Sequence, residues 1–161
     1  MGPHAVSGKA IVLGMLERGG RVVAKVVGNT QRRTLLPQIV KHVEPSTEIH
    51  SDEHPAYLGL VGPRYEHKVI NHTIAYVEGN VHTNGIENFW SLLKRGIRGT
   101  YVSVEPFHLF RYLDEQSFRF NERKHERGDA GRFVEVLSQV AGRRLTYRTL
   151  IGATALEGHP A

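Results

Sequence analysis

The run from His82 to Arg95 constrains the fold of this chain more than any other segment. Glu87, Ser91 and Lys94 follow one another at intervals of four and three, so in a helix they lie one above another on one face. The opposite face would carry the apolar residues of this region, which also recur at intervals of three and four and are therefore expected to be buried: Ile86, Phe89, Trp90, Leu93 and Ile97. The segment predicts a helix that packs on one side and presents an acid and a base on the other.

The patterns on either side of this helix predict an α/β, or mixed α+β, order of elements. Gly19-Gly20 between two β-rich runs favours a tight hairpin turn, because glycine readily adopts the positive φ that such a turn needs. In chain order, we expect a hairpin of strands 10–16 and 21–27, a helix from about 29 to 43, a strand at 47–52, a turn or short helix at 55–60, a strand at 67–72, the helix described above, a helix from about 103 to 123, a last helix from about 132, and a helical turn at 147–151.

Composition narrows the class of protein. The chain has 161 residues, of which 40% are hydrophobic and 23% charged, a composition typical of a globular domain. Its net charge of +5 favours a polyanionic partner. It has no cysteine, which excludes disulfides and cysteine-based zinc sites. No apolar run approaches the roughly 20 residues of a membrane span, and no glycine-rich nucleotide-binding loop is present, so neither a membrane nor a nucleotide cofactor is expected.

Asp52 and Glu87 are the candidate metal ligands. One ends a predicted strand and the other lies in the first turn of a helix, and carboxylates so displayed can hold Mg²⁺ or a similar hard ion. Each also has an ordinary interpretation, as a turn residue and as an acid favoured by the helix dipole. Asn84 is either the helix cap or a contact to metal or substrate, His82 is a possible contact in the active site, and Lys94 is either a solvated charge or a ligand for DNA phosphate.

These residues give the chain a resemblance to a known family. It resembles the catalytic domain of bacterial insertion-sequence transposases of the DDE type, which share the ribonuclease-H-like, integrase-like fold. The segments that carry the resemblance span most of the chain: Ile11 to Gly20, Ser51-Asp52-Glu53 with Tyr57, Val69 to His72, His82 to Tyr101, and Phe118 to Arg123. The segment from His82 to Tyr101 is the most specific of them.

The resemblance implies a fold and a domain organisation. The expected fold is a ribonuclease-H-like mixed sheet flanked by helices, N-terminally truncated, with extra C-terminal helices. Residues 1–9 are expected to be a tag remnant or disordered leader. Residues 10–127 would form the core, and residues 128–161 a helical extension of the same domain.

The resemblance also implies roles for individual residues. Asp52 and Glu87 would be the second and third catalytic, metal-binding acids, with Asn84 as a rival or auxiliary ligand, and the metal would be Mg²⁺ or Mn²⁺. The residues implied to contact DNA are basic or close to the acids: Lys94, Arg95, Arg98 and His82. Such enzymes cleave a DNA strand at the element end and join the freed 3′-hydroxyl to target DNA. The partners would be element ends, target DNA and further copies of the chain, in the bacterial cytoplasm.

One departure from the family bears on activity. The family's first acid lies on a strand ahead of the hairpin, whereas residues 1–9 contain no aspartate or glutamate. We therefore expect the first strand and first acid to be missing, a sheet edge to be open to another strand, and catalysis to be impaired. Whether the chain is itself an active enzyme stays open. The alternatives are a non-catalytic DNA-binding or assembly module that keeps the fold, and a ribonuclease-H-type nuclease.

Overall fold

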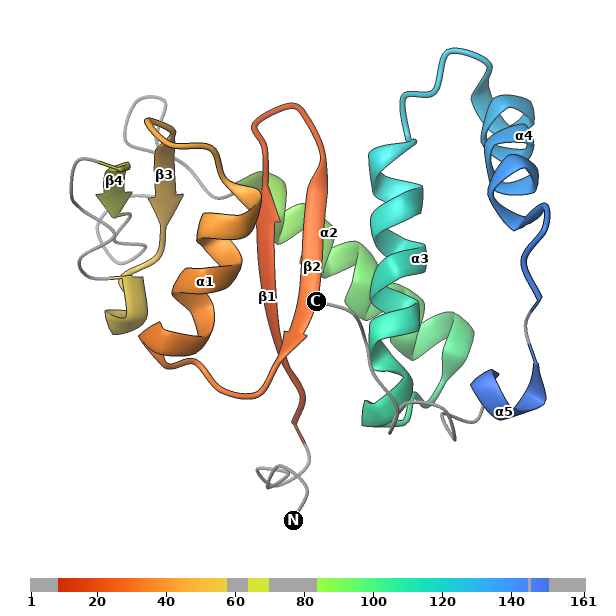
Figure 1. The fold of residues 1–161 in the computed structure, drawn as a ribbon, viewed down its shortest axis with the longest axis horizontal. Helices are drawn as coiled ribbons and strands as arrows, with labels where there is room; N and C mark the ends of the chain where they lie inside the picture. Colours follow the sequence, from red (N-terminus) through yellow and green to blue (C-terminus); the bar gives the residue numbers. More distant parts are fainter. Residues whose placement is uncertain (1–8, 58–63, 70–83, 145, 151–161) are drawn as a thin grey trace. The chain divides into compact units, whose positions relative to one another are not determined.

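The chain has a mixed α+β fold. A computed structural model describes residues 9–57, 64–69, 84–144 and 146–150 (Figure 1). The chain divides into two compact units, Met1–Asn121 and Glu122–Ala161, and each is described by itself. The first unit contains all the described strands, and no helix in the described ranges is long and apolar enough to cross a membrane.

The first unit begins with the predicted hairpin. Strand β1 (Ile11–Leu16) pairs antiparallel with β2 (Val22–Val27), and Leu16 lies opposite Val22. In the turn, Gly19 has a φ of 72°, a conformation that glycine adopts without the steric cost borne by other residues. The Gly-Gly signal in the sequence thus identified the hairpin correctly.

Helix α1 (Arg32–His42) follows the hairpin and begins slightly later than predicted. The side chain of Asn29 explains this start, because its Oδ1 accepts hydrogen bonds from the Gln31 N–H at 3.0 Å and the Thr34 hydroxyl at 2.7 Å. Ile39 of α1 forms a small core with the buried Tyr65. The hydroxyl of Tyr65 donates to the Val43 carbonyl at 3.0 Å, which ties the end of the helix to the residue directly before Glu66.

Strand β3 (Glu48–Ser51) and strand β4 (Glu66–Val69) form a second sheet, and they run parallel. Among the described residues, the strands pair in two groups of two, and no ladder joins β1 to β3. Both sheets nevertheless contact the core around Ile39 of α1, because Met15 of β1 and Ile49 of β3 pack against it.

The open edge of β1 can be assigned to particular residues. The Glu17 N–H donates to the Arg21 carbonyl at 2.9 Å. Glu17 and Arg21 are therefore a hydrogen-bonded pair, and bonded and non-bonded pairs alternate along an antiparallel ladder. The next pair, Leu16 and Val22, is thus non-bonded, so the backbone N–H and C=O groups of Leu16, Gly14 and Val12 point away from β2. Within the described ranges these groups face no strand partner. An edge of this kind can accept another strand.

The main core lies between the hairpin and two helices, α2 (Asn84–Gly96) and α3 (Leu109–Asn121). Its most buried side chains are Phe89, Leu113 and Val22, at 0%, 1% and 1% exposure. Between the helices, the chain continues α2 as a π-helical segment, η2 (Ile97–Tyr101), and then forms a 3-10 turn, η3 (Pro106–His108). The remaining short turn of this unit is η1 (Pro55–Tyr57), after β3.

The second unit contains α4 (Gly128–Val140) and the short α5 (Tyr147–Leu150). The prediction that the last long helix starts at about residue 132 was wrong, because the glycines at its beginning lie inside the helix. A Cβ on Gly131 would lie 2.2 Å from the ring of His125. Glycine is therefore needed at this position for close packing against the preceding turn and does not interrupt the helix.

Candidate functional site

Helix α2 presents the acid and the base to solvent, as its sequence predicts. Glu87, Ser91 and Lys94 are all exposed, whereas Phe89 and Leu93 on the opposite face are buried. Glu87 lies in the first helical turn, which favours a carboxylate, and Lys94 lies in the last, which favours an ammonium. The helix dipole thus stabilises the negative charge of Glu87 and the positive charge of Lys94.

The buried face fixes α2 against the hairpin. The Phe89 ring makes edge contacts with Trp90 and Phe120, with centroid distances of 5.0 and 5.5 Å. Trp90 lies over Gly14 of β1, where a Cβ would come within 2.3 Å of the indole. Trp90 thus packs against the core, as the spacing of the apolar residues of this segment predicts.

The first turn of α2 lies close to the end of β1. A Cβ on Gly85 would lie 2.6 Å from a methyl group of Leu16. A larger residue at position 85 would push the start of the helix away from the strand. The position of Glu87, two residues further on, therefore depends on glycine, which has no side chain, at position 85.

Asp52 directly follows β3 and is exposed. Its Oδ1 accepts a long hydrogen bond of 3.2 Å from the backbone N–H of His54. Burial, together with the negative charge of Asp52, raises the pKa of the neighbouring Tyr57 hydroxyl. Tyr57 thus lies close enough to the carboxylate of Asp52 to sense its charge.

Ser51 and His67 hold the backbone at Asp52. The Ser51 hydroxyl donates to the Asp52 carbonyl at 2.8 Å and lies 2.8 Å from Nε2 of His67. Because a hydroxyl has one proton and a carbonyl only accepts, Nε2 of His67 must be the donor in the second contact. Sequence reasoning missed this pair, because the register of two short parallel strands was not fixed by their composition.

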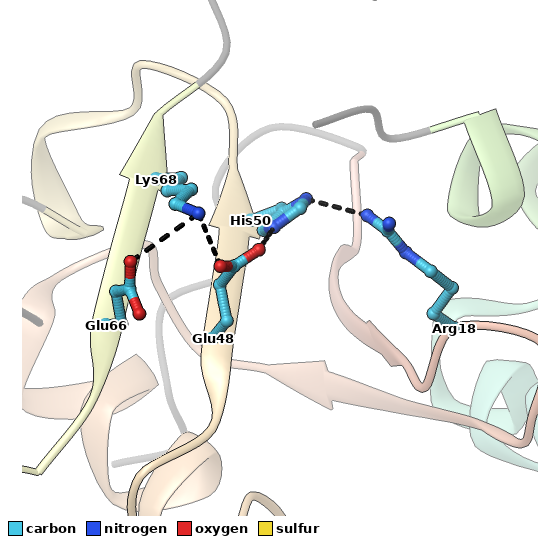
Figure 2. A network of polar contacts seen from close by, with 5 residues as sticks. All are labelled: Arg18, Glu48, His50, Glu66 and Lys68. Atoms are coloured by element: carbon cyan, nitrogen blue, oxygen red, sulfur yellow. Dashed lines mark hydrogen bonds and ion pairs between the residues drawn. The ribbon is translucent and has the colours of Figure 1, made fainter. Parts of the chain in front are cut away.

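A polar network joins residues of β3 and β4 to Arg18 (Figure 2). Glu48 bonds both His50 and Lys68, and Lys68 also lies 3.5 Å from Glu66. Arg18, from the hairpin turn, donates to Nδ1 of His50 at 3.0 Å. Hydrogen bonds from Lys68 and then His50 lower the pKa of Glu48 to about 2.

The other predicted site residues fall as follows. Asn84 is the first residue of α2 and is exposed, as are Arg95 and Arg98 beyond it. His82 lies outside the described residues. Among the described residues, no group of three or more histidine and acidic side chains is placed to hold a metal ion. The structure therefore positions Asp52 and Glu87 on separate elements and leaves their joint use as ligands a prediction.

Comparison with protein families decides the identity. Residues 2–121 match the ISXO2-like transposase domain. The chain belongs to this family of insertion-sequence transposases of the DDE type. No curated protein and no solved structure matches it.

In this transposase domain, the family match and the first compact unit end at the same residue, Asn121. All the predicted site residues fall within the match. Helices α4 and α5 lie beyond it, just after the boundary that the packing of the chain defines.

Proposed function

We propose that this transposase domain binds DNA at element ends and targets, and that Asp52 and Glu87 are its acids for metal-dependent strand cleavage and strand transfer. The observation that carries the proposal is the exposed face of α2, with Glu87 in its first turn and Lys94 in its last. This face belongs to a helix held rigidly by the core, and rigid elements suit a site whose ligands must be placed accurately.

The donor set suits a hard divalent ion. Asp52 and Glu87 supply carboxylate oxygens, the ligands that Mg²⁺ and Mn²⁺ prefer. Asn84, on the same helix as Glu87, would add an amide oxygen or replace one of the acids. A bound ion of this type would stabilise the charge on the oxygens that exchange at phosphorus.

The cations of α2 and the following segment would hold the DNA backbone. Lys94, Arg95 and Arg98 are exposed and lie within two turns of one another. Lysine and arginine on a fixed helix can neutralise successive phosphates, which supports binding without sequence preference. His82, just before α2 in the sequence, is a further candidate for DNA contact.

Asp52 and Glu87 alone provide fewer ligands than a two-metal site needs, so a further carboxylate would complete such a site. The open edge of β1 would be the place where a further strand adds to the sheet.

DNA binding provides the first test. A labelled duplex should bind the wild-type chain with an affinity that falls steeply with salt. Lys94→Met should weaken binding and reduce the slope of log affinity against log salt by about 1. Lys41→Met removes the same charge from the exposed end of α1 and is the matched control, so it should leave the slope unchanged. Equal effects of both variants would mean that overall charge, not the face of α2, binds DNA.

A non-catalytic DNA-binding or assembly module is the alternative that the same fold allows. In that case Asp52→Asn and Glu87→Gln would leave the function intact, and only the cations would matter. A ribonuclease-H-type nuclease would instead need both acids but show hydrolysis without joining. Joining of a labelled element end to target DNA by the purified chain in Mg²⁺ would contradict both alternatives.

A further inference from the structure

The hairpin contacts the helix that carries the first candidate acid, Glu87. Trp90 of α2 packs over Gly14 of β1, and Leu16, at the end of β1, lies against the first turn of the helix. That contact falls at Gly85, two residues before Glu87. The end of the hairpin strand thus fixes where Glu87 lies.

The turn of the same hairpin contacts the strand that leads to the second candidate acid, Asp52. The guanidinium of Arg18, two residues after Leu16, donates to Nδ1 of His50 at 3.0 Å (Figure 2). His50 lies on β3, two residues before Asp52. Three successive residues of the hairpin therefore include a contact to each of the two elements that carry the acids.

The ring of His50 is held from both sides. Because a guanidinium only donates, Nδ1 accepts from Arg18, and Nε2 carries the proton that it donates to Glu48. The side chain of His50 is only 11% exposed, so loss of Arg18 would leave an acceptor with little access to water. This contact is therefore worth more than an ion pair between two fully exposed side chains.

The remaining contacts between the hairpin and the second sheet are less directional. Among the described residues, no ladder of backbone hydrogen bonds joins β1 to β3. Met15 and Ile49 pack on the same core around Ile39, but apolar contacts set no direction. A hydrogen bond weakens steeply as its angle departs from linearity, so the bond from Arg18 to His50 restricts how β3 can shift against the hairpin.

We propose that Arg18 is a positioning residue, whose bond to His50 fixes the spacing between Asp52 and Glu87. The inference rests on the proposed function, in which these two acids together hold one divalent ion. A site of this kind binds its ion well only when the ligands are placed accurately, so a small shift of β3 against the hairpin weakens binding. Arg18 acts through His50 and β3, not by contact with the ion.

Binding of Mn²⁺ to the full chain tests this role, because charge and positioning predict opposite effects. Removal of a cation should, by charge alone, strengthen binding of a divalent cation. As a positioning residue, Arg18 predicts the reverse: Arg18→Met should weaken Mn²⁺ binding about three- to tenfold, the range that one hydrogen bond is worth. Unchanged or tighter binding by Arg18→Met would overturn the proposal.

Arg33→Met is the matched control for this measurement. Arg33 is also an exposed arginine, and its Nε donates to Gln31, two residues away along the chain, at 2.8 Å. The variant loses the same charge, so it should bind Mn²⁺ as tightly as the wild type or slightly more tightly. Weakening equal to that of Arg18→Met would mean that the bond to His50 is not the cause.

A double-mutant cycle tests whether Arg18 acts through His50. His50→Phe keeps the shape of the side chain and removes both ring nitrogens. In that background Arg18→Met should have no further effect on Mn²⁺ binding, because its partner is already lost. Additive losses would overturn the assignment of His50 as the residue through which Arg18 acts.

A distance measured without metal separates this inference from the proposed function. Val69→Cys on β4 and Asn88→Cys on α2 are both exposed positions, and the chain has no native cysteine, so the pair can be spin-labelled selectively. Dipolar electron paramagnetic resonance should show that Arg18→Met shifts or broadens the distance distribution and that Arg33→Met does not. An unchanged distribution in Arg18→Met would overturn the positioning role. A shift in a chain that binds no Mn²⁺ would support that role and contradict the proposed function alone.

Discussion

The side chain of Asn121 forms two hydrogen bonds with the backbone of Val22. Its Oδ1 accepts from the Val22 N–H at 2.7 Å, and its Nδ2 donates to the Val22 carbonyl at 3.0 Å. These backbone groups point away from β1, because Val22 lies opposite Leu16 in a non-bonded pair of the ladder. The amide therefore completes the outer edge of β2 as a neighbouring strand would, and it joins the end of α3 to the start of the sheet.

Asn121→Ala should destabilise the fold by about 2–4 kcal/mol, since it leaves two backbone groups of a buried residue without partners. Asn121→Asp should cost less, because it retains an acceptor for the N–H. Denaturant unfolding measures both effects. Asn88→Ala, at an exposed amide on α2, is the control and should change stability by less than about 0.5 kcal/mol. Equal stability of the two alanine variants would contradict this role of Asn121.

Gly14→Ala should destabilise the protein by about 1–3 kcal/mol, because the new methyl group would overlap the Trp90 indole. The indole emission spectrum should shift as the ring moves. Gly28→Ala meets no atom within 4 Å and is the comparison, expected to be neutral. If both variants unfold at the same denaturant concentration, the close packing of α2 on β1 is not as described.

The carboxyl group of Glu48 should titrate far below its ordinary value of 4.5, with a midpoint near the pKa of about 2. Its folded pKa is lowered, so its contribution to stability is complete above 4.5 and is lost as the pH falls from 4.5 through about 2. NMR titration of the carboxyl carbon measures the midpoint. Lys68→Met removes the largest cause and should return the midpoint toward 4.5, whereas an unchanged midpoint would exclude Lys68 as that cause.

Local sequence patterns predicted the elements that depend on neighbours in the chain. The hairpin followed from Gly19-Gly20 between β-rich runs, and α2 followed from the spacing of its apolar residues, of which Phe89 and Leu93 are buried. Start points were less accurate. A glycine such as Gly131 serves for close packing as well as for breaking helices, and the sequence alone does not distinguish the two uses.

Long-range relationships lay beyond prediction from the sequence. Asn121 and Val22 are 99 residues apart, and nothing in either segment names the other as its partner. The Ser51–His67 contact likewise depends on the register of β3 and β4. The exposed charges of the candidate site were identified because their helix could be predicted. The contact of His67 with Ser51, beside Asp52, was not, because His67 comes from another strand.

Asn84 and Glu87 can be distinguished as metal ligands by comparing two variants of α2. If the acid is the ligand, Glu87→Gln should abolish binding of Mn²⁺, and Asn84→Ala should reduce it by less than tenfold. If the amide is the main ligand, the order of the two effects reverses. Because Asn84 is the first residue of the helix, circular dichroism should accompany the titration to show that α2 still forms.

Binding of Mn²⁺ measured by electron paramagnetic resonance tests the central claim most directly, because it does not require strand transfer by this chain. The claim is that Asp52 and Glu87 together hold one divalent ion. Wild-type protein should bind Mn²⁺, and Asp52→Asn and Glu87→Gln should each weaken binding at least tenfold. Glu105→Gln, at an exposed acid elsewhere in the first unit, should bind as the wild type does. Wild-type affinity in either the Asp52 or the Glu87 variant would contradict the proposed site.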